Sequence, residues 1–137
     1  MSKITPFLMF GGKAKEALDF YTSIFPKAKI ENITFYGEDD SGDVGTVKLA
    51  NFSLNGQSFM CIDSNAPHGF TFTPAISFYI NYDSEKEIDE YFEKLSNDGQ
   101  VFMPLSKYPF SEKFGWIADK FGVSWQLNLS NSEQNEI

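Results

Sequence analysis

Residues 4–26 read ITPFLMFGGKAKEALDFYTSIFP, and this stretch decides the fold because the chain repeats its plan further on. Residues 4–10 form an apolar run rich in β-forming side chains that ends at Gly11-Gly12, which predicts a strand and a turn. Apolar residues then recur every three or four positions as far as Pro26, which predicts an amphipathic helix.

The second copy is AISFYINYDSEKEIDEYFEKLSNDG, residues 75–99, at a shift of 71 positions and without a gap. A second match follows at a shift of 66, where residues 56–60 (GQSFM) align with residues 122–126 (GVSWQ). Two matched segments in the same order indicate a duplicated module whose second copy has shorter loops.

Each half therefore reads as a strand, a helix and three further strands. The strands after the first helix are predicted at residues 29–36, 44–54 and 57–63, with a hairpin at Asn55-Gly56. The second half predicts strands at 75–82, 100–103, 114–119 and 123–129, with residues 104–113 irregular. We predict an α+β fold of two βαβββ modules forming cupped mixed sheets.

The predicted organisation is one domain over residues 1–130, which suits a chain of 137 residues. The modules occupy residues 3–63 and 75–129, joined by a connector at 64–74, and residues 131–137 form a polar tail.

Composition excludes several classes of partner. The net charge is −8 and every basic residue is Lys, which argues against nucleic acid and against an anionic membrane surface. No apolar run approaches the length of a membrane span, and no charged-then-apolar signal segment opens the chain. The single cysteine, Cys61, excludes an intramolecular disulfide, and we expect a cytoplasmic protein.

Alternation in the strands predicts which side chains line a cavity. In the last strand Trp125 and Leu127 should lie under a helix, so Ser124, Gln126 and Asn128 should face a concave side. The repeat transfers this pattern to the other strands, and it places Ile76 under the second helix. The predicted cavity residues are Pro6, Leu8, Met60, Ile62, Ser77, Tyr79, Trp116 and Gln126.

Three residues are candidates for catalysis. His68, the only histidine, lies in the Pro-rich connector and is either a surface residue or a base held over the cavity. Tyr79 and Gln126 could hydrogen-bond a ligand or serve structural hydrogen bonds. Cys61 alternates with Met60 and should be a buried thiol on the helix side. The acidic stretch GEDDSGD, residues 37–43, lacks calcium-loop spacing and should be a hairpin tip.

The paired βαβββ plan, with EALDFYTSIFP in the first helix, resembles the glyoxalase/bleomycin resistance/dioxygenase (vicinal oxygen chelate) superfamily. The resemblance is closest to its PhnB-like group, also labelled demethylubiquinone methyltransferase-like. It is carried by FLMFGGKAKEALDFYTSIFP, GTVKLANFSLNGQSFMCID, HGFTFTPAISFYI, EIDEYFEKLSNDG and FGWIADKFGVSWQLN. It implies an open cupped sheet, a homodimer, and a metal position near residues 4–6, Met60, Ala75 and Gln126 in metal-using relatives.

Of those positions only Gln126 could coordinate such a cation, whereas zinc and iron sites use three or four His, Glu or Asp ligands. We therefore expect no metal. We also expect no cofactor, since no Gly-rich turn typical of nucleotide binding is present.

The predicted function is a metal-free, PhnB-like small-molecule-binding protein. Three alternatives stay open: a lyase or isomerase using His68, Tyr79 or Gln126, a drug- or metabolite-sequestering protein, and a metal enzyme with ligands from other positions. The mode of dimerisation, side by side or domain-swapped, also stays open.

Overall fold

The computed structural model describes residues 2–130. The chain divides into two compact units, Met1–Gly69 and Phe70–Ile137. Their boundary falls inside the predicted connector at residues 64–74. The predicted polar tail, residues 131–137, lies outside the described residues.

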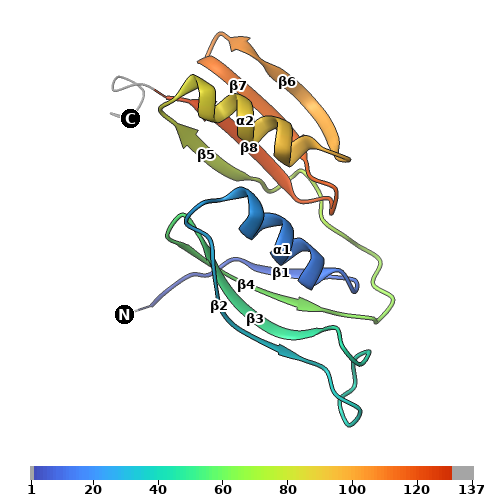
Figure 1. Ribbon diagram of the computed structural model, residues 1–137. Coiled ribbons are helices and arrows are strands. Elements are labelled where there is room, and N and C mark those ends of the chain that lie inside the picture. The colour runs from blue at the N-terminus through green and yellow to red at the C-terminus, as the bar shows by residue number, and fades with distance from the viewer. Residues whose placement is uncertain (1, 131–137) are drawn as a thin grey trace. The chain divides into compact units, whose positions relative to one another are not determined.

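The first unit is a four-stranded mixed sheet with one helix on one face (Figure 1). The strand order is β1-β4-β3-β2, in which β1 and β4 run parallel and the other pairs run antiparallel. Asn55 and Gly56 both have positive φ, 50° and 88°, as the predicted two-residue hairpin requires. The elements are β1 (Phe7–Phe10), α1 (Ala14–Ile24), β2 (Lys29–Phe35), β3 (Val47–Leu54) and β4 (Gln57–Asp63).

The second unit repeats this topology with the order β5-β8-β7-β6, and β5 and β8 are its parallel pair. The predicted α+β fold of two βαβββ modules is confirmed. The elements are β5 (Phe78–Tyr82), α2 (Glu85–Ser96), β6 (Gln100–Tyr108), β7 (Ser111–Ala118) and β8 (Ser124–Leu129).

The prediction of an irregular segment at residues 104–113 is wrong. Strand β6 continues to Tyr108, and β7 already begins at Ser111. Pro104 lies inside β6, which is tolerated because β6 is an edge strand that pairs only with β7. The register between these two strands is shifted at several points between Val101 and Tyr108, which marks bulges.

Each core lies between one helix and the inner face of its sheet. Leu18 and Tyr21 of α1 are fully buried, as is Cys61 of β4, so the predicted buried thiol is confirmed. The buried residues between α2 and the second sheet include Ile88 and Leu95 of the helix and Ile117, Trp125 and Leu127 of the sheet. Ser84 caps α2, because its side-chain oxygen accepts a hydrogen bond from the Glu87 N–H. Ile76 is 73% exposed rather than covered, because β5 begins two residues after it, at Phe78.

The register of β1 differs from the facing predicted for this strand. Phe7 pairs with Met60, and Leu8 pairs with the buried Cys61, so Leu8 faces the helix side. In the second unit Tyr79 pairs with Gln126. The strand equivalent of Tyr79 is therefore Phe7, at a shift of 79 − 7 = 72 rather than 71.

The extra position lies in the turn before the helix. Three residues, 11–13, separate β1 from α1, whereas two residues, 83–84, separate β5 from α2. A slip of one residue moves every side chain of a strand to the opposite face. Phe7 and Met9 consequently take the face predicted for Pro6 and Leu8, and Pro6 precedes the strand, with its carbonyl accepting the Met60 N–H.

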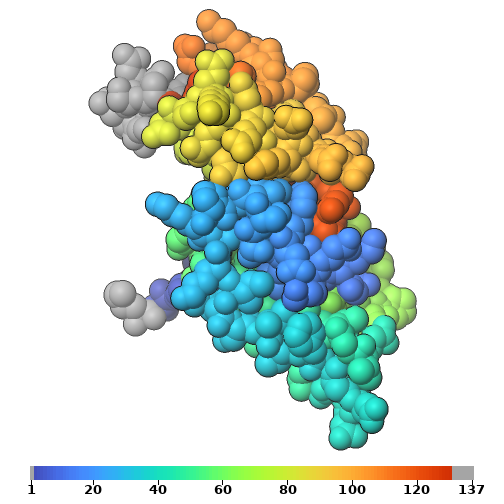
Figure 2. All heavy atoms as spheres, in the orientation of Figure 1, coloured from blue at the N-terminus to red at the C-terminus, as the bar shows by residue number. Residues whose placement is uncertain are grey.

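The acidic turn at residues 37–43 projects from the first unit between β2 and β3 (Figure 2). The Asp40 carboxylate accepts hydrogen bonds from the Gly37 N–H at 2.7 Å and from Lys48 Nζ at 2.9 Å. These two bonds, the Gly37 bond first, hold the pKa of Asp40 below its ordinary value. The turn is thus a hairpin tip stabilised from within, as predicted. Over residues 2–130, neither helix is long and apolar enough to cross a membrane.

Candidate functional site

The face of each sheet opposite its helix is here called the cup face. In the second unit Tyr79, Gln126 and Trp116 form one row across β5, β8 and β7, because Gln126 pairs with both of the others. Trp125 and Leu127 alternate with Gln126 and are buried on the helix side. These three residues, predicted for the cavity, therefore lie side by side on one face.

A chain of hydrogen bonds joins this row to two serines. Gln126 Nε2 donates to Ser77 Oγ at 3.2 Å, and Ser77 Oγ lies 2.6 Å from Ser124 Oγ. Trp116 Nε1 donates to Ser124 Oγ at 2.8 Å. Ser77, Trp116 and Gln126 are thus held by one network, and Ser124 links them.

A second polar pair lies next along the same strands. Asn128 Nδ2 donates to Asn81 Oδ1 at 3.0 Å, and Ser111 Oγ donates to Asn128 Oδ1. Asn128 lies on the same face as Gln126, as the alternation of the last strand predicts, and Asn81 follows from Tyr79 by the same alternation. Neither asparagine was in the shorter list of residues predicted to line the cavity.

Aromatic rings gather beside this pair. Tyr79 lies with its ring centroid 6.2 Å from that of Phe114, and Phe110 lies 4.9 Å from Phe114 in an edge-on arrangement. Tyr108 stacks on Phe110 at 5.7 Å. Tyr79 is 53% exposed and Phe110 is 59% exposed, so part of this aromatic surface is open. Partial burial raises the pKa of the Tyr79 hydroxyl above its ordinary value of 10.0, which makes the phenol a weaker acid.

The cup face of the first sheet is more apolar. Met60 and Ile62 lie on it as predicted, opposite Phe7 and Met9 of β1, and Phe7 is 57% exposed. Two polar contacts lie on the same face. Asn51, which pairs with Met60, donates from Nδ2 to Asn32 Oδ1 at 2.8 Å, and Lys3 Nζ donates to Ser58 Oγ at 3.2 Å.

His68 is exposed in the first unit, where its Nε2 lies 2.9 Å from Ser64 Oγ. Tyr79 and Gln126 belong to the second unit. The role of His68 as a base stays a prediction.

The residues of the cup faces do not fit a zinc or iron site. The second sheet offers hydroxyl, amide and indole groups, and neither Met60 nor Ile62 on the first sheet supplies a charged ligand. Within residues 2–130, no group of three or more His, Cys, Asp or Glu side chains could hold a metal ion. This donor set differs from the three or four charged or imidazole ligands that such ions require.

The Gly-Gly turn before α1 does not fit a nucleotide-like cofactor either. A helix N-terminus preceded by glycines is a common place for phosphate. Here Asp63 takes that place: its Oδ1 accepts from the N–H groups of Gly12 at 2.8 Å and Ala14 at 3.0 Å. Its Oδ2 accepts from the Val47 N–H at 2.9 Å. Sequence reasoning missed this role, because Asp63 comes to the turn only through the pairing of β4 with β1.

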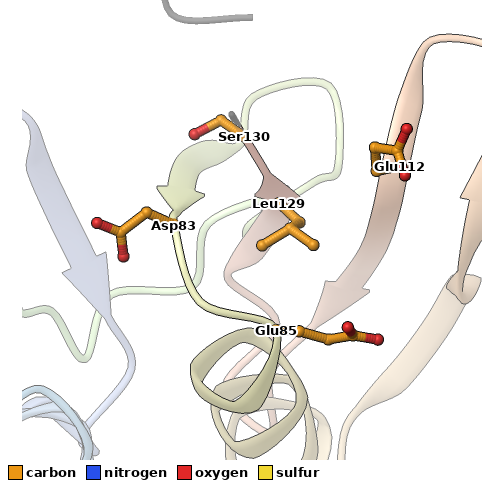
Figure 3. Close-up of a pocket in the computed structure, with 5 residues that line it drawn as sticks. All are labelled: Asp83, Glu85, Glu112, Leu129 and Ser130. Carbon is orange, nitrogen blue, oxygen red and sulfur yellow. The ribbon is translucent and has the colours of Figure 1, made fainter. Parts of the chain in front are cut away.

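A hollow of about 360 Å³ lies at one end of the second sheet, apart from the row described above (Figure 3). The Asp83 carboxylate points away from Glu85 and Glu112, and Glu85 is already bonded to Lys113 Nζ at 3.1 Å. These acids therefore do not converge on a common point. The lining residues are Asp83, Glu85, Glu112, Leu129 and Ser130.

Two βαβββ modules, each with a parallel outer pair of strands and one helix-covered face, define a protein of the glyoxalase/vicinal-oxygen-chelate fold. A glyoxylase/bleomycin resistance protein/dioxygenase domain from Frankia sp. EAN1pec shares this fold with a TM-score of 0.65 and 18% identity. The similarity covers 96% of this chain and 99% of that one.

The family model for 3-demethylubiquinone-9 3-methyltransferase matches residues 2–128, and the chain belongs to this family. A PhnB protein from Bacillus cereus, described by the same methyltransferase name, is 58% identical with a TM-score of 0.91. That match covers 94% of this chain and all 100% of the other. Protein PA1353 from Pseudomonas aeruginosa is 26% identical with a TM-score of 0.81, over 95% and 98% of the two chains. The predicted PhnB-like resemblance is confirmed.

Proposed function

We propose that this protein binds a small molecule on the cup face of its sheets, without a resident metal. The observation that carries the proposal is the row of Tyr79, Gln126 and Trp116 on one face of the second sheet. Ligand sites combine apolar and aromatic walls with a few fixed polar groups. The network through Ser77 and Ser124 fixes the Gln126 amide, and the half-exposed Tyr79 supplies part of the wall.

The family name describes methyl transfer, but the residues of this chain do not support that activity. The Gly-Gly turn that could receive a nucleotide-like methyl donor already binds the Asp63 carboxylate. Binding is the function that the cup faces support better. We place the protein in the cytoplasm, as a homodimer.

Tryptophan fluorescence tests the binding proposal. Trp116 lies on the cup face, whereas Trp125 is 2% exposed under α2 and serves as an internal reference. Aromatic ligands from a diverse library should quench the fluorescence saturably, and Trp116→Phe should remove this change. Gln126→Ala should weaken binding about tenfold, the loss expected for one ligand hydrogen bond of about 1.4 kcal/mol. Absence of saturable quenching across the library would count against the proposal.

A metal assay tests the second part of the proposal, that the protein has no resident metal. Protein purified without chelator should contain far less than one zinc, nickel or iron ion per chain. Stoichiometric metal would overturn the metal-free proposal and restore the alternative of a metal enzyme.

An enzyme is the second candidate, and Tyr79 is the observation that favours it. Its hydroxyl lies on the face of the proposed ligand, so it could protonate a bound enolate as a general acid. If a lyase or isomerase substrate is found, Tyr79→Phe should lower kcat at least about a hundredfold. An unchanged kcat would remove Tyr79 as the acid.

A further inference from the structure

The hydrogen-bond network of the second cup face has a fixed direction. Indole N–H is only a donor, so Ser124 Oγ accepts the bond from Trp116 Nε1. Ser124 is 2% exposed, and its own proton must find an acceptor inside the protein. Ser77 Oγ, at 2.6 Å, is that acceptor.

This direction leaves two groups unused at the open end. Ser77 Oγ accepts from both Ser124 and Gln126 Nε2, so the Ser77 hydroxyl proton points to neither of them. Gln126 Oε1 receives no hydrogen bond from the described residues. The network therefore ends in one donor, the Ser77 O–H, beside one acceptor, Gln126 Oε1.

Aromatic side chains stand on both sides of this pair. Tyr79 and Trp116 flank Gln126 on the neighbouring strands, and adjacent strands lie about 4.8 Å apart, so the two flanking positions are about 10 Å apart. The Trp116 ring packs against Phe102 with centroids 5.0 Å apart, and the Tyr79 ring lies 6.2 Å from that of Phe114. A planar ring above the Gln126 amide would meet one of these aromatic pairs on each side.

Among the described residues, the side chains that border Gln126 on β5, β7 and β8 carry no formal charge. An ionised ligand group would lose its water there without gaining a partner of opposite charge. A carboxylate would also turn an acceptor oxygen towards Gln126 Oε1, which is itself an acceptor. The side chains concerned are Ser77, Tyr79, Asn81, Phe114, Trp116, Ser124, Gln126 and Asn128.

We infer that the ligand of this face is an uncharged planar ring compound that carries a hydrogen-bond acceptor next to a donor, as in a ring carboxamide or lactam. Its carbonyl oxygen accepts from the Ser77 O–H, its N–H donates to Gln126 Oε1, and its ring lies between Tyr79 and Trp116. This inference rests on the proposed binding function and specifies its ligand class.

Two compounds with the same ring and different charge test it: 2-naphthamide, which is neutral, and 2-naphthoate, which is an anion at pH 7.5. Both are titrated into the full chain by calorimetry and by tryptophan fluorescence. We expect 2-naphthamide to bind at least about tenfold more tightly than 2-naphthoate, the factor that corresponds to one hydrogen bond. Gln126→Leu should remove that preference, and Ser77→Ala should weaken 2-naphthamide about tenfold.

Gln57→Leu is the matched control, because Gln57 is an exposed glutamine of the first unit whose substitution should change neither affinity. If Gln126→Leu does not fold, the isosteric Gln126→Glu replaces it. That variant should retain 2-naphthamide and weaken 2-naphthoate further, because it adds a like charge.

The outcomes separate the two proposals. Equal or tighter binding of 2-naphthoate, with quenching that needs Trp116, overturns the inference and leaves the binding function standing. Failure of both compounds while another library ligand binds has the same consequence. Failure of every ligand overturns both proposals.

Discussion

Asp63 is the residue on which the first unit depends most for its polar contacts. It is 2% exposed, and its two oxygens accept three backbone N–H groups. Lys13, at the N-cap of α1, makes no side-chain cap, so Asp63 caps that helix from another strand.

Asp63→Asn should lower the free energy of unfolding by about 1–3 kcal/mol. The amide that replaces one oxygen would face an N–H donor and leave it without an acceptor. Urea denaturation measures the change. Asp39→Asn, the same substitution on the exposed hairpin tip, should change stability by less than about 0.5 kcal/mol. Equal effects of the two variants would contradict the role of Asp63.

Tyr82 presents the opposite case, because its buried hydroxyl has no hydrogen-bond partner in the described structure. Burial also raises its pKa, which shows how unfavourable a charge would be there. Tyr82→Phe should therefore leave stability unchanged or raise it by up to about 1 kcal/mol. Tyr36→Phe is the contrast: the Tyr36 hydroxyl donates to the Asp63 carbonyl at 3.0 Å, and its loss should cost about 1 kcal/mol. Thermal melts of both variants compare them directly, and a Tyr82→Phe loss as large as that of Tyr36→Phe would be the contrary result.

Cys61 gives a prediction about pH. Burial first, and the nearby Asp63 charge second, raise the pKa of the thiol from 9.0 to about 12. The thiol is therefore protonated at pH 8 in the folded protein, and disulfide reagents, which need the thiolate, should react only after unfolding in urea. Because the folded pKa is the higher one, stability should be complete below about pH 9 and decline towards pH 12. Reaction of one thiol per chain at pH 8 without urea would contradict this.

At the scale of elements, the helices and most strands could be predicted from the sequence, because they depend on hydrophobic periodicity and on local turn signals such as Asn55-Gly56. The side of the sheet that each β1 residue faces could not be predicted. The helices match at a shift of 71, but the turn before α1 has one residue more than the turn before α2, so β1 matches β5 at a shift of 72. The continuation of β6 through Pro104 could not be predicted either. Proline is tolerated there because β6 is an edge strand, and the sequence alone does not show which strand lies at the edge.

The same distinction applies to the candidate site. Tyr79 and Gln126 lie on the predicted face because alternation within β5 and β8 is a local property, and Ser77 accepts a hydrogen bond from Gln126 there. Tyr108 and Phe110 were not among the predicted cavity residues, because their approach to Phe114 depends on the pairing of β6 with β7.

The contact between β7 and α2 can be tested at Gly115. A side-chain methyl at Gly115 would overlap the ring of Phe92 on α2 and approach Leu105 Cδ1 at 3.2 Å. Gly115→Ala should therefore cost about 1–3 kcal/mol of stability through overpacking. Gly11→Ala, where the added methyl meets nothing within 4 Å, is the control and should cost less than about 1 kcal/mol. Combining Gly115→Ala with Phe92→Leu should recover part of the loss in urea denaturation, and full additivity would contradict the contact.

At the scale of the whole molecule, association and charge oppose each other. The proposed homodimer would cover apolar side chains that the single chain leaves open, among them Ile4 at 93% and Ile76 at 73% exposure. It would also bring together two chains that each carry a net charge of −8. Salt screens such repulsion over distances beyond about 8–10 Å at physiological strength and leaves apolar contacts intact or strengthens them.

We therefore predict that the chain sediments as a dimer, twice its mass of 15.5 kDa, at tens of micromolar, and that its dissociation constant falls as sodium chloride rises from about 0.05 to 0.5 M. Sedimentation velocity across a dilution series at both salt concentrations measures this. Ile76→Ser should weaken the dimer. Val44→Ser is the matched control, because it also removes an exposed apolar side chain but lies by the β2–β3 hairpin tip. A species of 15.5 kDa at both salt concentrations would contradict the dimer, and weaker association at high salt would show that charge attraction, not apolar contact, holds it together.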